Sequence, residues 1–168
     1  MKDAVCSRMD RIELTDGLCR ITFDPSTVEG LGIVSNGPNI KHIKDGSAKM
    51  PFASIGVEDL SIADLFDGTK LNEKGNAHFL RLVHDLDPSN WTLKGVNIRG
   101  RFRDGKGMHT QNKMGWLYVL LTNNEGAEAV CDFCDLKCGM CYVVSIYREG
   151  DDQKAHQIWD LINSVQVK

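Results

Sequence analysis

Four cysteines lie close together near residue 135, and their thiols are the groups in this sequence with the most specific chemistry. They form two C-x-x-C units within eleven residues, at Cys131, Cys134, Cys138 and Cys141. Paired C-x-x-C units suit tetrahedral zinc, because each unit can present two sulfurs to one ion. The pattern therefore predicts one structural zinc ion bound by four thiolates, which leaves no open coordination position for hydrolytic chemistry.

Other states of these four thiols stay open: two disulfides, an iron–sulfur cluster or free thiols. Neither common ferredoxin spacing is present, which disfavours the cluster. A redox C-x-x-C of the thioredoxin kind opens a helix, whereas Cys141 leads into an apolar run typical of a strand. The compact spacing resembles the short structural zinc lobe of alcohol dehydrogenases, and this resemblance implies that one ion fits sterically.

Three arginines alternate with other residues in a second segment that could carry function. Arg99, Arg101 and Arg103 would share one face of a strand, because side chains alternate along a strand. Residues 91–130 hold more basic than acidic side chains, although the whole chain has a net charge of −3. The stripe is interpreted either as a docking surface for phosphate or an acidic protein, or as a solvated edge strand whose charge prevents aggregation.

The five histidines do not assemble into a recognisable site. His78 and His84 are six residues apart, which does not fit a helical metal-binding pair. An enzyme would have to use His84 or His109, and no nucleophile signal accompanies either one. The sequence thus predicts a protein that is not an enzyme and has no evident small-molecule substrate.

A hairpin is predicted at the start of the chain, where Asp16-Gly17 separates two alternating apolar runs. Centring the turn on this dipeptide pairs Leu14 with Cys19, Ile12 with Ile21 and Glu13 with Arg20. The predicted apolar face consists of Ile12, Leu14, Cys19, Ile21 and Phe23. Both Cys6 and Cys19 are interpreted as buried free thiols.

Further elements follow from apolar periodicity and capping signals. Residues 57–66 are expected to be helical, and residues 76–86 fit either a helix or a buried strand. An antiparallel meander is expected to follow, with strands at 91–103, 116–121 and 141–147. A C-terminal helix at about 152–164 carries an apolar stripe. The fold class is therefore α+β, an antiparallel sheet with an N-terminal hairpin, a C-terminal meander and a C-terminal helix packed on one face.

Composition sets the remaining expectations. A length of 168 residues with 42% apolar and 26% charged residues is ordinary for one globular domain, here expected to span 1–168 with a cysteine-rich loop at 123–140. No apolar run is long enough to cross a membrane. Residues 1–8 lack the apolar core of a signal peptide, which predicts a cytoplasmic protein. A periplasmic location is the alternative if the cysteines form disulfides.

The C-terminal order of strand, Gly-containing loop, strand and helix, ending Ile162-Asn163-Ser164-Val165-Gln166-Val167, resembles the tail of the PsbP/Mog1-like α/β sandwich family. The resemblance covers about thirty residues and implies an α/β sandwich fold, in a family that consists mostly of binding proteins. We expect a small protein-binding protein, such as an inhibitor, an immunity protein or an adaptor, in which the cysteine-rich loop at 123–140 presents the surface for another protein. The alternative is a nucleic-acid-binding module that uses the basic strand beside a zinc loop.

Overall fold

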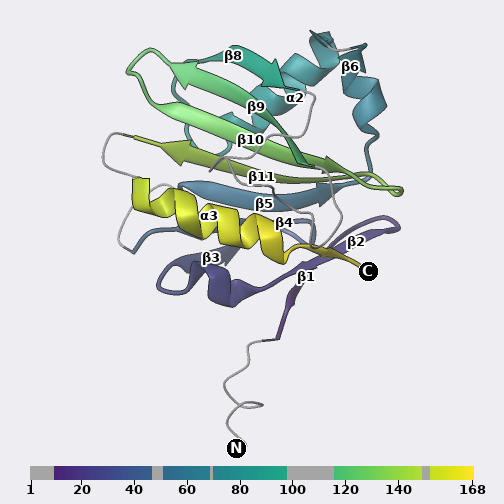
Figure 1. The fold of residues 1–168 in the computed structure, drawn as a ribbon, viewed down its shortest axis with the longest axis vertical. Helices are drawn as coiled ribbons and strands as arrows, with labels where there is room; N and C mark the ends of the chain where they lie inside the picture. Colours follow the sequence, from purple (N-terminus) through teal and green to yellow (C-terminus); the bar gives the residue numbers. More distant parts are fainter. Residues whose placement is uncertain (1–9, 47–50, 69, 98–115, 149–151) are drawn as a thin grey trace, which may run out of the picture.

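A seven-stranded antiparallel sheet forms the centre of the molecule (Figure 1). The computed structural model describes residues 10–46, 51–68, 70–97, 116–148 and 152–168. Across the sheet the strands are β3 (Gly32–Ser35), β4 (Ile40–Lys44), β5 (Ala53–Glu58), β11 (Met140–Tyr147), β10 (Glu128–Asp135), β9 (Trp116–Asn123) and β8 (Trp91–Asn97). The late strand β11 thus pairs with the early strand β5 and joins the two halves of the chain.

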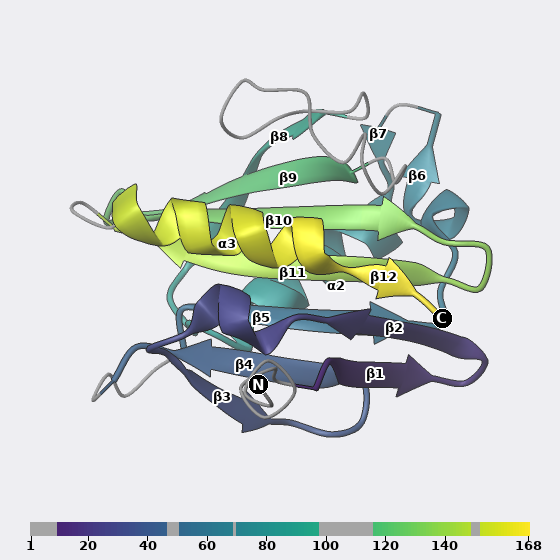
Figure 2. The same ribbon diagram turned by 60° about the horizontal axis from the view of Figure 1, so that its bottom comes forward.

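A second, three-stranded sheet brings the beginning and the end of the described chain together. Its order is β1 (Ile12–Asp16), β2 (Cys19–Phe23) and β12 (Gln166–Val167), so that β12 lies beside β2 (Figure 2). β6 (Phe66–Asp67) and β7 (Lys70–Leu71) form a two-stranded ribbon. It lies at the end of the molecule opposite to β1 and β2 (Figure 1). The described residues form the helices α2 (Glu73–His84) and α3 (Asp152–Ser164) and two short 3-10 turns, η1 (Pro25–Val28) and η2 (Ile62–Leu65).

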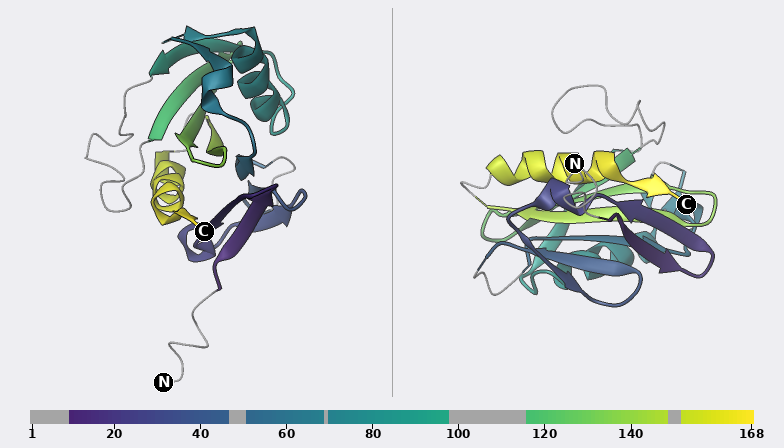
Figure 3. Two further views of the ribbon diagram at one scale, coloured as in Figure 1. Left: turned by 90° about the vertical axis from the view of Figure 1, so that its right-hand side faces the viewer. Right: turned by 90° about the horizontal axis from the view of Figure 1, so that it is seen from below.

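Two apolar cores lie on opposite faces of the large sheet, and each is covered by one helix (Figure 3). On β11, Cys141 and Val143 face the core that contains α3 and β2, whereas Tyr142 and Val144 face the core that contains α2. A strand covered on both sides reads as a continuous apolar run, since neither face meets water. This explains why the 141–147 segment is apolar at nearly every position.

The predicted α+β class is confirmed, with its N-terminal hairpin, C-terminal meander and C-terminal helix. Strands β8 to β11 pair in sequence order as the meander. The C-terminal helix packs its apolar residues Ile158, Leu161 and Ile162 into one core. Among the described helices, none combines the length and the apolar character that crossing a bilayer requires.

The predicted helix over residues 57–66 is wrong. Residues 53–58 form β5, which is buried between the two cores, and only Ile62–Leu65 form a 3-10 turn. Ser61 caps that turn by accepting a hydrogen bond from the Ala63 amide. Ser61 therefore caps one short turn and not a full helix.

The predicted hairpin register is also wrong, although its faces are right. Cys19 pairs with Asp16, and Leu14 pairs with Ile21, which is a shift of two positions along the partner strand. The two turn residues are Gly17 and Leu18, with Gly17 at φ +61°. Because side chains alternate along a strand, an even shift keeps the same residues on the same face. The apolar face is therefore preserved, with Leu14, Cys19, Ile21 and Phe23 all buried.

Candidate functional site

The predicted four-cysteine zinc site is wrong. Cys131 and Cys134 lie three positions apart on β10, within the segment expected to be a loop, so their side chains point to opposite faces of the sheet. Cys131 packs in the α2 core and Cys134 in the α3 core. Cys138 is bonded to Cys19. Among the residues that the structure describes, no group of three or more His, Cys, Asp or Glu side chains could hold a metal ion.

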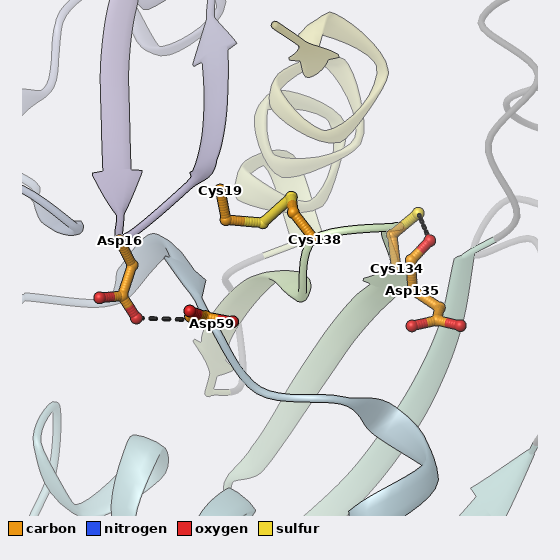
Figure 4. Close-up of a disulfide and its surroundings, with 6 residues drawn as sticks. All are labelled: Asp16, Cys19, Asp59, Cys134, Asp135 and Cys138. Carbon is orange, nitrogen blue, oxygen red and sulfur yellow. Dashed lines mark hydrogen bonds between the residues drawn. A yellow bond between two sulfur atoms is a disulfide. The ribbon is translucent and has the colours of Figure 1, made fainter.

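A disulfide between Cys19 and Cys138 joins two hairpin turns, with an S–S length of 2.04 Å and a Cα–Cα distance of 5.0 Å. Cys19 is the first residue of β2, and Cys138 lies in the turn between β10 and β11 (Figure 4). The expectation that Cys19 is a free buried thiol is therefore wrong. Cys6 lies outside the described residues. We call residues 16–19, 58–59 and 135–139, which meet at this end of the sheets, the cross-linked corner.

Three contacts besides the disulfide hold the corner together. The Asp59 backbone amide donates a 2.7 Å hydrogen bond to Asp16 Oδ2, which ties the end of β5 to the first hairpin (Figure 4). Leu136 and Gly139 exchange backbone hydrogen bonds of 2.7 and 3.3 Å across the second turn. A Cβ atom on Gly139 would lie 2.2 Å from the Glu58 carbonyl oxygen, so only glycine permits this close approach.

The corner exposes one large apolar side chain. Leu18 is 92% exposed, whereas the other exposed large apolar residues in the described part of the chain, Val34 and Val167, are 46% and 49% exposed. Leu18 lies on the two-residue turn between Asp16, which is hydrogen bonded to Asp59, and Cys19, which is in the disulfide. The side chain is thus presented on a backbone that is anchored on both sides.

Three aspartates lie beside the two turns of the corner. Asp59 and Asp135 are exposed, and Asp16 is half-buried. None of these three carboxylates takes part in an ion pair among the described residues. Lys137 is the exposed cation of the second turn. Aspartates therefore outnumber lysines at the corner, which gives it an acidic character.

The three remaining described cysteines are buried thiols. Burial raises the pKa of Cys134 to about 12 and raises the pKa values of Cys131 and Cys141 as well. The thiolate is the nucleophilic and metal-binding form of cysteine. These residues therefore act as apolar core groups at neutral pH, and Cys134 is the cross-strand partner of Cys141.

A polar cluster lies on the other face of β5 beside α2, and it consists of Glu58, His78, Arg81 and Tyr142. Glu58 Oε1 lies 3.5 Å from Arg81 Nη2 and 3.7 Å from His78 Nε2. The same Arg81 nitrogen lies 3.3 Å from His78 Nδ1. Tyr142 packs its ring over Gly56, where a Cβ atom would lie 2.4 Å from the tyrosine oxygen.

Burial dominates the electrostatics of this polar cluster. Burial, together with the positive charges of Arg81 and Lys74, lowers the pKa of His78 to about 4. Burial raises the pKa of Glu58, while the charge of Arg81 acts against that shift. Tyr142 is buried, and both burial and the charge of Glu58 raise its pKa. The neutral histidine and the neutral tyrosine are thus the stable forms near pH 7.

The other predicted site residues are not brought into this region. Arg99, Arg101, Arg103 and His109 lie outside the described residues. His84 is exposed at the end of α2. The polar cluster was missed, although the helical interpretation of residues 76–86 already placed His78 and Arg81 one turn apart. Glu58 could not be added, because residues 57–66 had been assigned to a helix.

No protein-family model matches the sequence, and a search of curated proteins finds no match either.

Proposed function

We propose that this chain is a small protein-binding protein of the inhibitor, immunity-protein or adaptor kind, and that the cross-linked corner contacts its partner. The observation that carries the proposal is Leu18, a leucine exposed to 92% on a turn whose neighbours are fixed by a disulfide and a hydrogen bond. Burying a leucine side chain contributes roughly 1.5–3 kcal/mol. A partner with a matching apolar pocket would gain that free energy.

The anchoring of the turn supports the same proposal. Association is opposed by the entropy lost when interface groups become ordered, and pre-organised segments lose less of it. The backbone around Leu18 is already held at Asp16 and Cys19. An apolar residue on such a turn is suited to act as the central anchor of an interface, with polar residues at its rim.

The carboxylates of the corner, which form no ion pair with any residue that the structure describes, indicate the charge of the partner. Asp16, Asp59 and Asp135 would attract a surface that carries lysine or arginine around an apolar pocket. Complementary charge at the rim of an interface mainly raises the association rate, and salt weakens this effect. The partner is thus expected to associate more slowly as the ionic strength rises.

Two earlier hypotheses stay predictions. The nucleic-acid-binding alternative depends on Arg99, Arg101 and Arg103, which lie outside the described residues. The PsbP/Mog1-like resemblance depends on a short C-terminal segment and gains no further support. A structural zinc ion is no longer part of the proposal.

We also propose an oxidising compartment, such as the periplasm, in place of the cytoplasmic location expected from the sequence. Disulfides form and persist mainly in oxidising compartments. The Cys19–Cys138 bond supports this proposal. Cell fractionation of the native host, followed by intact-mass measurement without reductant, tests it.

The binding proposal is tested by affinity capture from the native host with wild type, Leu18→Ser and Val34→Ser. Val34 is the matched control, because it is also an exposed aliphatic residue on a strand but lies outside the corner. We expect Leu18→Ser to weaken binding of the captured partner by at least about tenfold and Val34→Ser to leave it unchanged. Equal binding by wild type and Leu18→Ser, at equal thermal stability, would exclude the corner as the contact surface.

A further inference from the structure

The hydrogen-bonding atoms of His78 fix which ring nitrogen carries its proton. The guanidinium of Arg81 can only donate hydrogen bonds, and its Nη2 lies 3.3 Å from His78 Nδ1. Nδ1 must therefore be the acceptor, and the neutral ring must carry its proton on Nε2. Nε2 faces Glu58 Oε1 at 3.7 Å and has no hydrogen-bond partner within the described part of the chain.

We propose that His78 and Arg81 form a proton-sensitive switch, in which protonation of His78 expels the Arg81 guanidinium from the polar cluster. A second ring proton, taken from solvent, has to bind Nδ1, because Nε2 already carries one. This proton occupies the lone pair that accepts the hydrogen bond from Arg81. Two donors then face each other at the distance of a hydrogen bond, and both groups are positively charged.

Arg81 is the group that moves. Its side chain is 56% exposed, whereas the His78 side chain is 7% exposed and packs edge-on against Phe79. A guanidinium on a long side chain at the surface can reach solvent by rotating its own bonds. His78 cannot do so without disturbing the α2 core.

The charges around the ring favour this outcome. Among the described residues, Arg81 and Lys74 from α2 repel a protonated ring, and Glu58 from β5 would attract it only while its own carboxyl group is ionised. Tyr142 from β11 is neutral near pH 7, and Asp85 and Asp16 add negative charge at Glu58. Because burial raises the pKa of Glu58, this carboxyl group takes up its proton before His78 does as the pH falls. When the ring is protonated, Arg81 therefore has neither the lone pair of Nδ1 nor an ionised Glu58 to hold it in the polar cluster.

Release of Arg81 would change the charge displayed next to the cross-linked corner. Glu58 directly precedes Asp59, whose amide is hydrogen bonded to Asp16. In acid, a free guanidinium would stand close to this acidic end of the molecule. The inference does not depend on the binding proposal, because protons are the only ligand involved.

The switch is tested by NMR of the histidine rings and the Arg81 side chain as the pH is lowered from 7 to 3. At neutral pH the ring ¹⁵N shifts of His78 should report the Nε2–H tautomer. Arg81→Met should raise the pH at which His78 titrates by about one pH unit, since a like charge beside the ring is removed. Lys74→Met is the matched control, because Lys74 is an exposed cation on the same helix that repels the ring less strongly, and it should cause a smaller rise.

Two results would overturn the switch. One is an Nδ1–H tautomer in the wild-type protein at neutral pH. The other is an Arg81 side chain that keeps its contact with the His78 ring after the ring has been protonated. Both are measured on the wild-type chain, so that a variant which fails to fold does not prevent the decision. Arg81→Gln, which also lacks the charge, serves as the second variant.

Discussion

The disulfide joins Cys19 to a residue 119 positions later in the chain. A cross-link that closes so long a segment removes much of the conformational freedom of the unfolded chain, which is expected to raise the free energy of unfolding. Here it also fixes the relative position of two turns that belong to different sheets. A single bond therefore acts both on stability and on the geometry of the corner.

The double variant Cys19→Ser/Cys138→Ser should lower the free energy of unfolding by about 2–5 kcal/mol. Urea denaturation without reductant measures the difference. Reductant provides the control, because it should lower the stability of the wild type and leave the double variant unchanged. A wild-type intact mass equal to that of the fully reduced chain, or a Cys19 peptide not linked to Cys138, would contradict the bond.

Single residues of the site were predictable only in part. The alternation around Asp16-Gly17 correctly placed Cys19 on the buried face, because burial on a strand follows the local pattern. Its partner Cys138 was not predictable, since the contact depends on how two distant hairpins pack. The C-x-x-C spacing is equally ambiguous: in a turn it brings two sulfurs together, but on β10 it separates Cys131 from Cys134.

At the scale of elements, the backbone at the start of α2 lies very close to the backbone of η2. Asn72 caps the helix by accepting a 2.8 Å hydrogen bond from the Gly75 amide. A Cβ atom on Gly75 would lie 2.2 Å from the Leu65 carbonyl oxygen and 2.8 Å from Leu71 Cδ2. The first turn of α2 therefore packs directly on η2, and this contact needs a residue without a side chain.

Gly75→Ala should destabilise the protein by about 1–3 kcal/mol, because the added methyl group must displace backbone atoms. Helix propensity alone favours the opposite result, since alanine is better than glycine in a helix by about 1 kcal/mol. Thermal or urea denaturation decides between the two. Lys74→Ala, an exposed change on the preceding residue, should be nearly neutral. A Gly75→Ala variant more stable than the wild type would show that the helix is not held this closely.

Helices and strands with a strong local apolar pattern were predictable from the sequence, and those without such a pattern were not. Strands β9 and β11 and helix α3 follow from apolar runs and an apolar stripe, which tertiary structure did not override. Strands β4 and β10 were missed, because β4 lies in a segment rich in turn formers and β10 contains the cysteines. Residues 53–58 are buried on both faces, and periodicity does not separate such a strand from a helix.

For the whole molecule, the titration of His78 should make the free energy of unfolding depend on pH. Its pKa is lowered from 6.5 to about 4 in the folded state. Between these values the unfolded chain binds more protons than the folded chain, so the free energy of unfolding falls as the pH falls from 6.5 towards 4. The loss is at most about 3.5 kcal/mol, at about 1.4 kcal/mol for each pH unit. Glu58 reduces it, because its raised pKa makes the folded chain bind protons in the same region.

Urea denaturation at several pH values between 7 and 4 tests this dependence. His78→Gln cannot titrate and should lose less stability over this range than the wild type does. His84→Gln is the matched control on the same helix, because His84 is exposed, and it should follow the wild type. Parallel curves for wild type and His78→Gln would show that the acid sensitivity arises elsewhere.

The order of the strands also constrains how the chain can fold during its synthesis. The central strand β11 pairs with β5 on one side and β10 on the other, and it leaves the ribosome long after β3, β4 and β5. Until then, the edge of β5 that will receive β11 has no partner from this sheet. A nascent chain would thus carry an open apolar strand edge for most of translation, which is the state that holdase chaperones protect.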